Sequence, residues 1–157
     1  NGLKMQSLGS SGDELVNVIH GLASGNIYKA NQSDEIPSLP GAYLLAVFLA
    51  NPFDLSVSTL PATTLPRGWY IYAGSARGPG GLKARVGRHL RRGKSPRWHI
   101  DPLTEAATEM FASLYVEGRE CGLMTKVIKS QRFQVPVPGF GSSDCRICPS
   151  HLAAFIA

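Results

Sequence analysis

The chain has 157 residues and a formal net charge of +5, with 43% hydrophobic and 17% charged residues. This length suits one core of ordinary size, and the composition is typical of a globular protein. No apolar run approaches the roughly 18 residues that a membrane-spanning helix needs, so we expect no membrane partner. Three cysteines, an odd number, and the lack of a secretory signal argue against a disulfide framework and favour a reducing, cytoplasmic location.

The sequence predicts an N-terminal extension, residues 1–38, followed by a domain at 39–157. Residues 1–12 are rich in Gly and Ser, are typical of residues added in cloning, and are assigned no function. Residues 13–23 carry apolar side chains at helical spacing and two acidic residues in the expected first turn, where the helix dipole favours negative charge. We therefore expect a short helix there.

Three strands are predicted within the domain. Residues 41–50 form an almost unbroken apolar run, which suits a buried central strand. Residues 69–74 are aromatic and β-branched and are expected to stop at Gly74; a long connection with three prolines joins the two strands as a hairpin. Residues 109–117 alternate enough to be the third strand.

Two helices follow from the apolar periodicity. Within residues 82–92 an apolar residue recurs every fourth position, Arg85, Arg88 and Arg92 share a neighbouring face, and His89 lies between the two faces. Residues 120–130 form the second helix.

The remaining part of the chain, residues 135–143, contains four Pro and Gly residues and must be a loop, and residues 151–156 are expected to form a last helical turn. The fold class is therefore α/β (α+β), with a small three-stranded antiparallel sheet flanked by helices.

Basic residues are concentrated in one part of the chain. No acidic residue occurs between Asp54 and Asp101, whereas the stretch from Arg77 to Arg97 supplies half of the sixteen Lys and Arg residues. Such a one-signed stretch attracts a polyanion, and DNA is the expected partner, although the pattern also suits RNA or a merely solvated basic helix. The predicted nucleic-acid contacts are Arg77, Lys83, Arg88, Arg91, Arg92, Lys94, Arg97 and His99.

Several short motifs form an ordered set. GAY stands at 41–43, YAG at 72–74, Arg85 precedes His89 by one helical turn, and Glu120 begins a later helix. This order and spacing resemble the GIY-YIG nuclease superfamily. WHIDPL at 98–103, the Glu120–Cys121 pair, and GFGSSDC followed by SHL, at 139–145 and 150–152, resemble a branch of unknown function that is found alone or joined to endonuclease III-like glycosylases.

The resemblance implies a metal-dependent DNA endonuclease that hydrolyses phosphodiester bonds, with a structure-specific role in DNA repair. Glu120 would hold one Mg²⁺ or Mn²⁺, a hard cation that takes few carboxylates and keeps several waters. Arg85 would bind the scissile phosphate with its planar fork. Tyr43, Tyr72 and His89 would converge on the attacking water, and the sequence does not decide which of them accepts the proton. A tyrosine base would need a pKa lowered from about 10, which Arg85 and the metal would supply.

Two other functions remain open: a non-catalytic nucleic-acid-binding domain, and a module that docks onto a DNA-repair enzyme. Many members of the superfamily carry an asparagine near the end of the domain, but no asparagine follows Asn51 here. Ser143, Asp144 and His151 are the candidates for that position. Taken singly, the tyrosines are also explained as strand aromatics, and Glu120 as a helix-dipole residue.

A second group of residues has the chemistry of a structural zinc site. Cys145, Cys148 and His151 follow one another at three-residue spacing, and Cys121 would be the fourth ligand. A single CxxC falls short of the paired pattern, so buried cysteines that act as small hydrophobes are favoured over zinc. Residues 142–144 with a histidine have the residue types of a hydrolase triad, but no G-x-S-x-G motif accompanies them.

Overall fold

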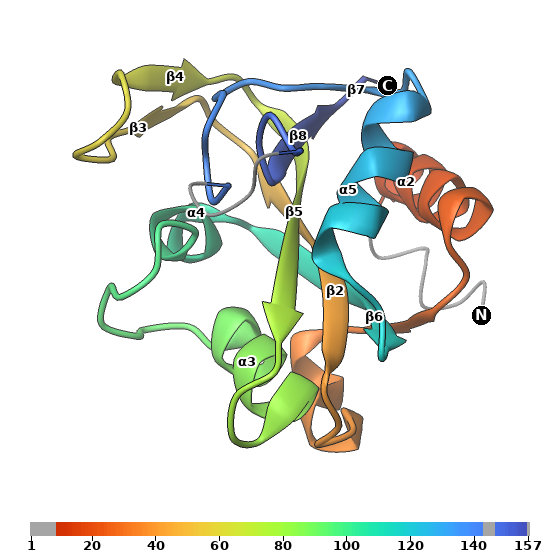
Figure 1. Cartoon of the computed structure of the whole chain (residues 1–157). Helices are drawn as coiled ribbons and strands as arrows, with labels where there is room; N and C mark the ends of the chain where they lie inside the picture. The colour runs from red at the N-terminus through yellow and green to blue at the C-terminus, as the bar shows by residue number, and fades with distance from the viewer. Residues whose placement is uncertain (1–8, 143–146, 157) are drawn as a thin grey trace.

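The computed structural model describes residues 9–142 and 147–156, which form a six-stranded antiparallel sheet, a separate two-stranded hairpin and helices on both faces of the sheet (Figure 1). The strands are β1 (Asn26–Tyr28), β2 (Gly41–Leu49), β3 (Phe53–Leu55), β4 (Thr63–Leu65), β5 (Gly68–Ala76), β6 (Glu109–Val116), β7 (Phe133–Gln134) and β8 (Leu152–Phe155). The helices are α2 (Gly9–Leu22), the 3-10 helix η1 (Ala30–Glu35), α3 (Gly81–Leu90), α4 (Asp101–Ala106) and α5 (Glu120–Lys129).

The sheet has the order β1-β6-β2-β5-β8-β7, with β2 in the interior between β6 and β5. Both faces of β2 are covered, which explains why its sequence is apolar at nearly every position. Successive side chains point to opposite faces: Tyr43 and Leu45 pack on the side of α3 and α4, whereas Leu44 and Ala46 pack on the side of α2 and α5.

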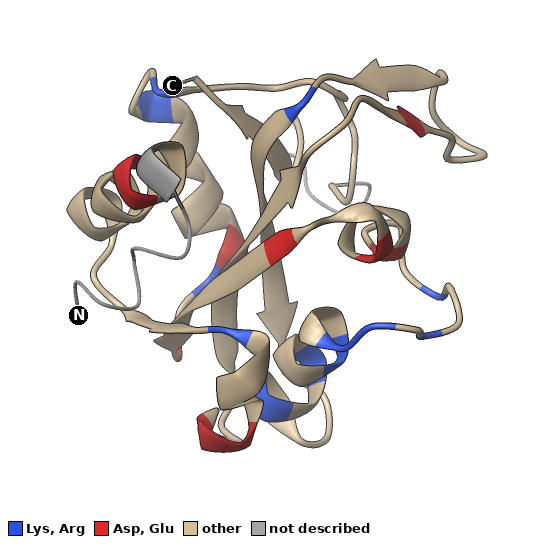
Figure 2. Ribbon diagram, turned by 180° about the vertical axis from the view of Figure 1, so that it is seen from behind, with Lys and Arg blue, Asp and Glu red and all other residues tan. Residues whose placement is uncertain are grey.

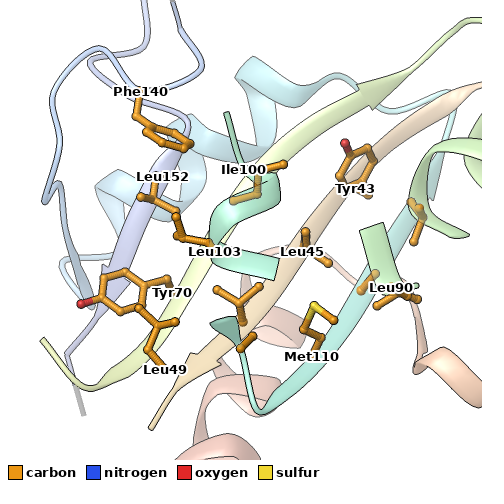
Figure 3. Packing of buried hydrophobic residues seen from close by; sticks show 14 of the residues in the cluster. Tyr43, Leu45, Leu49, Tyr70, Leu90, Ile100, Leu103, Met110, Phe140 and Leu152 are labelled. Carbon is orange, nitrogen blue, oxygen red and sulfur yellow. The ribbon is translucent and has the colours of Figure 1, made fainter. Parts of the chain in front are cut away.

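Two hydrophobic cores result, one on each face of the sheet. The first lies under α3 and α4 and includes Tyr43, Leu45, Leu90 and Leu103; Figure 3 shows Tyr43 and Leu45 following each other along one strand. The second lies under α2 and α5. Tyr43 is the largest fully buried side chain, so its hydroxyl must find a partner inside the protein.

Three differences from the predicted elements concern strands. The sheet has six strands rather than three, because β1, β7 and β8 are too short to show a periodic pattern. The expected helical turn at 151–156 is wrong, since β8 occupies Leu152–Phe155 and pairs with β5. β5 continues to Ala76, so Gly74 lies inside the strand and does not end it.

The predicted helices are confirmed with shifted ends. α3 stops at Leu90, and Arg91 adopts an extended backbone, so Arg92 lies beyond the helix that was expected to carry it. α2 begins at Gly9, which places Asp13 and Glu14 inside the helix instead of in its first turn. The proline-rich connection of residues 52–68 contains the β3–β4 hairpin.

Residues 9–38 take part in both cores and in the sheet. Leu15 and Ile19 of α2 are buried in the second core, β1 pairs with β6, and η1 packs against α3. Among the described residues, no helix combines the length and the apolar character needed to span a bilayer.

Candidate functional site

Five predicted site residues, contributed by β2, β5, α3 and α5, converge in the structure. The Tyr43 hydroxyl lies 2.7 Å from Nε2 of His89, and the rings of Tyr72 and His89 meet edge-on with centroids 6.3 Å apart. Arg85 and Glu120 both lie close enough to the two tyrosines to act on their pKa values. The structure therefore brings together Tyr43, Tyr72, Arg85, His89 and Glu120.

The start of α3 fixes where Arg85 and His89 lie. Gly81 has φ of 57°, in the left-handed region that glycine favours, and a Cβ there would collide with the carbonyl of Leu39. The backbone N–H of Leu82 donates to that carbonyl at 2.8 Å, and the N–H of Lys83 donates to Pro37 at 3.0 Å. α3 is thus anchored on the segment that enters β2, and its side chains are held in register with Tyr43.

Gly74 leaves the space that Tyr43 occupies. The two residues are direct partners across β2 and β5, and a Cβ on Gly74 would overlap the phenol ring and hydroxyl of Tyr43. The glycine of the YAG motif is therefore required by the tyrosine of the GAY motif. Sequence alone indicated only a strand end at this position.

Burial is the main cause of the shifted pKa values of the two tyrosines. It raises the pKa of Tyr43 far above its ordinary value, with the nearby Tyr72 adding to the shift and Arg85 opposing it. Burial, assisted by the negative charge of Glu120, also raises the pKa of Tyr72 to about 12. The charge of Arg85 by itself does not bring either tyrosine pKa below its ordinary value, because desolvation outweighs it.

His89 is neutral at physiological pH. Burial lowers its pKa to about 3, although the charge of Asp101 acts in the opposite direction. A protonated Tyr43 can donate its hydroxyl hydrogen to Nε2 of a neutral imidazole, which then carries its own proton on Nδ1. Nδ1 is buried and has no hydrogen-bond partner among the described residues. Such an orphaned polar atom is costly, and functional sites are a common reason for one.

Arg85 is held from two sides. Its guanidinium donates to the backbone carbonyl of Ser75 at 2.9 Å and lies over the ring of Trp98, 4.3 Å from the ring centre. Trp98 is 38% exposed, which is unusual for so large an aromatic ring. Sequence reasoning gave Trp98 no role of its own; the signal available was its place in the WHID motif, directly after the basic stretch.

Asp101 organises the loop that carries Trp98. Its carboxylate is buried and accepts hydrogen bonds from the backbone N–H groups of Arg97 and Trp98, at 2.7 and 2.8 Å, and from Arg88 at 3.1 Å. Burial alone would raise its pKa, but these three donors outweigh burial and hold the pKa below its ordinary value. Arg88 is therefore tied to this loop as an ion pair.

Glu120 begins α5 and lies beside a small hollow. Its side chain is 34% exposed, and Oε2 lies 3.5 Å from Nδ1 of His151. The hollow, of about 170 Å³, is lined by Ser75, Arg77, Arg119, Glu120 and Cys121. A single accessible carboxylate with room for water fits the needs of Mg²⁺, which is bound through one or two carboxylates and keeps several waters.

Some of the predicted nucleic-acid contacts are exposed to solvent, whereas others already pair with groups of the protein. Arg91 and Arg97 are exposed, and with Arg88 and Lys94 they line a hollow of about 550 Å³ beyond the end of α3. Figure 2 shows basic positions along α3 and the loop that follows it. Lys94, by contrast, pairs with Glu105 at 2.8 Å and its side chain is 2% exposed.

The other predicted contacts make hydrogen bonds or ring contacts at the surface. Arg77 donates to the carbonyl of Gly118, Lys83 donates to that of Asp34, and Arg92 donates to that of Thr104. The exposed ring of His99 lies against Phe140, with centroids 6.2 Å apart.

Three of the four predicted zinc ligands gather in space. The ligand atoms of Cys121, Cys148 and His151 all lie within 4.8 Å of one another. Cys145, the fourth, lies outside the described residues, as do Ser143 and Asp144, two of the candidates for the missing asparagine. His151, the third candidate, lies beside Glu120.

Comparison with known proteins assigns a family without an activity. The model of the family described as "Domain of unknown function DUF123" matches residues 42–157, which is well over half of the chain. No curated protein and no solved structure matches. The matched segment contains every residue of the site, from Tyr43 on β2 to His151 before β8. The chain belongs to this family of unknown function, DUF123.

Proposed function

We propose that this protein is a metal-dependent DNA endonuclease of GIY-YIG type that hydrolyses phosphodiester bonds. It would act in the cytoplasm and cut particular DNA structures during DNA repair. The observation that carries the proposal is the buried hydrogen bond between Tyr43 and His89, with Arg85 and Glu120 close by. The buried Nδ1 of His89, which has no partner among the described residues, costs stability, and the set of residue types is that of the superfamily the sequence resembles.

Glu120 would hold the divalent ion, Mg²⁺ or Mn²⁺. When bound, such an ion supplies neutralisation of negative charge on the phosphate and on the leaving oxygen. Glu120 is the residue of the set that offers an accessible carboxylate, and its place at the mouth of a hollow leaves space for the water ligands that Mg²⁺ retains.

Arg85 would bind the scissile phosphate. One nitrogen of its fork is used by Ser75, and its stack on Trp98 keeps the guanidinium plane fixed while the other N–H groups can donate to phosphate oxygens. Because Arg85 lies close enough to Tyr43 to act on its pKa, a phosphate held there would lie beside the Tyr43 hydroxyl.

His89 is the best proton acceptor of the three candidates, because both phenols keep their protons at neutral pH. The attacking water would pass a proton to the Tyr43 oxygen while Tyr43 passes its own to Nε2 of His89. The new bond forms between the water oxygen and phosphorus, and the bond to the leaving oxygen breaks. The negative charge of the phosphate favours the imidazolium and so raises the low pKa of His89 during the reaction.

The basic hollow beyond α3 would bind the DNA backbone. Arg91 and Arg97 are the exposed cations of this hollow and would contact phosphates. Arg88 and Lys94 are held in ion pairs and would form part of its wall. Phosphate contacts of this kind are independent of sequence and depend steeply on salt.

The test is cleavage of labelled single-stranded, duplex, flap, abasic and branched DNA with Mg²⁺ or Mn²⁺. We expect Arg85→Ala and Glu120→Gln to lower the cleavage rate at least about a hundredfold, as loss of an electrostatic stabiliser does, with DNA binding retained. Arg132→Ala and Glu14→Gln, which remove an exposed ion pair elsewhere, are the matched controls and should cut normally.

Each alternative predicts a different result in the same assay. Wild-type protein that binds every DNA of the panel but cuts none would indicate a non-catalytic nucleic-acid-binding domain. Wild-type protein that does not bind DNA or RNA even at low salt would favour a module that docks onto a repair enzyme. Either outcome contradicts the nuclease proposal.

A further inference from the structure

A second cluster of reactive side chains lies behind Glu120. It consists of Cys121 on the first turn of α5, Cys148 in the loop before β8, and His151 immediately before β8, and we call it the thiol–imidazole cluster. Cys148 and His151 are buried, and Cys121 is partly exposed. Two segments that are distant in sequence, the first turn of α5 and the segment just before β8, thus present two sulfurs and one nitrogen to a common point.

The spacing of these atoms is close to that around a tetrahedral metal. Ligand bonds of about 2.3 Å to sulfur and about 2.0 Å to nitrogen place neighbouring donors roughly 3.5 to 3.8 Å apart. Sγ of Cys121 lies 3.8 Å from Nε2 of His151, and all three donors lie within 4.8 Å of one another. Side-chain shifts of about one ångström therefore suffice to close the cluster on an ion.

The orientation of His151 supplies an independent argument. Its Nε2 faces the sulfur of Cys121, while its Nδ1 faces Oε2 of Glu120 at 3.5 Å. Nδ1 is buried and makes no hydrogen bond to any described residue. Metal-ligating histidines almost always direct their second nitrogen to a carboxylate or carbonyl, which fixes the tautomer. A metal on Nε2 would keep the proton on Nδ1, which would then face the Glu120 carboxylate as a hydrogen-bond donor.

We infer that the thiol–imidazole cluster binds a zinc-class divalent ion through Cys121, Cys148 and His151. Thiolate and imidazole are the ligands that zinc takes, whereas Mg²⁺ requires oxygen. On binding, both thiols lose their protons to solvent, the two sulfurs and Nε2 each donate a lone pair, and no electron is transferred. Cys148, whose thiol donates to the backbone carbonyl of Cys121 at 4.0 Å, would turn from that carbonyl to the metal.

The ion would link α5 to β8 and hold the imidazole that contacts Glu120. It would therefore stabilise the fold and position Glu120 without taking part in bond cleavage. The inference does not rest on the nuclease activity, because metal binding is measured directly.

The first experiment uses the whole chain, purified under reducing conditions, depleted of metal and titrated with Zn²⁺ or Co²⁺. We expect one Zn²⁺ per chain, release of two protons per ion, a rise in Tm, and for Co²⁺ the visible bands of tetrahedral geometry with a thiolate charge-transfer band. Octahedral Co²⁺ bands, or zinc that is lost to a weak chelator, would overturn the inference.

Variants then assign the ligands. Cys121→Ser, Cys148→Ser and His151→Asn should each weaken Zn²⁺ binding by more than the roughly 10–100-fold that loss of an outer-shell partner costs, and Glu120→Gln should fall in that outer-shell range. His20→Asn, on the exposed part of α2, is the control and should bind Zn²⁺ normally. Unchanged Zn²⁺ affinity in all three ligand variants would contradict the assignment, and if a variant does not fold, the Co²⁺ spectrum of the wild type decides.

Discussion

The hydroxyl of Tyr43 and Nε2 of His89 lie 2.7 Å apart, and each residue is only 1% exposed. Tyr43→Phe removes one partner of this buried pair and leaves Nε2 unsatisfied, which costs about 1–3 kcal/mol of unfolding free energy. We also expect DNA cleavage to fall at least about a hundredfold, since the relay to His89 is lost. Denaturant unfolding and single-turnover cleavage measure the two effects.

Tyr70→Phe is the matched control for that substitution. The Tyr70 hydroxyl donates to the carbonyl of Pro66 at 2.6 Å, away from His89. This variant should lose some stability but keep its cleavage rate once the folded fraction is taken into account. An equal loss of activity in both variants would mean that Tyr43 acts only through stability.

Gly74→Ala tests the contact between the two tyrosine motifs. The added methyl group would overlap the ring of Tyr43, so overpacking should cost about 1–3 kcal/mol and displace the Tyr43 hydroxyl from His89. Gly87→Ala in α3 is the control, because a Cβ there meets open space and should stabilise the helix by up to about 1 kcal/mol. The prediction fails if Gly74→Ala cuts DNA at the wild-type rate when fully folded.

The low pKa of His89 predicts a loss of stability in acid. The folded protein keeps His89 neutral down to about pH 3, whereas the unfolded chain protonates it near its ordinary value of 6.5. Stability from this group is therefore complete above pH 6.5 and falls by about 1.4 kcal/mol for each pH unit below it. Unfolding free energies measured between pH 7 and pH 4 should fall less steeply for His89→Gln than for the wild type.

His99→Gln provides the comparison for the pH series, since this histidine is exposed. Its unfolding free energy should follow the wild-type curve. A His89→Gln variant with the same pH slope as the wild type would show that His89 is protonated in the folded protein, and its role as neutral proton acceptor would then be wrong.

The basic residues divide into two groups with different predicted effects. Arg91→Ala and Arg97→Ala should each reduce the slope of log K against log salt by about 0.9 on duplex DNA, because each removes one phosphate contact. Lys94→Ala should instead lower the unfolding free energy, because its buried ammonium pairs with Glu105. Fluorescence anisotropy at several salt concentrations measures the slopes, and Arg132→Ala should leave the slope unchanged.

The central elements could be predicted from sequence because they carry strong local signals. β2 and β5 are apolar or aromatic runs bounded by glycine or proline, the residues of β6 alternate enough to indicate a strand, and α3 shows its buried stripe every four residues. β1, β7 and β8 span two to four residues each, too few to show a period. β8 is a strand because the edge of β5 offers it hydrogen bonds, and that edge is invisible in the local sequence.

The sequence predicted which residues form the site, but not how deeply they are buried or which contacts hold them. Helical periodicity placed His89 at the border of the apolar face. It did not show that His89 is fully buried, where a hydrogen bond to the Tyr43 hydroxyl offsets part of the cost of burying the imidazole. The stack of Arg85 on Trp98 depends on the Asp101 carboxylate that shapes the loop between α3 and α4. Spacing alone could not show that the side chains of Cys121, Cys148 and His151 lie together, because Cys121 is distant from the other two in sequence.

The position of β8 has a consequence for how the candidate site is assembled. The backbone N–H of Ala73, next to Tyr72, donates to the carbonyl of His151, so a late segment of the chain completes the edge of β5. A polypeptide still emerging from the ribosome would hold Tyr43, Arg85 and Glu120 before it holds this edge. Because β8 follows all three of these residues in the chain, this edge of the site can form only after β8 has been synthesised.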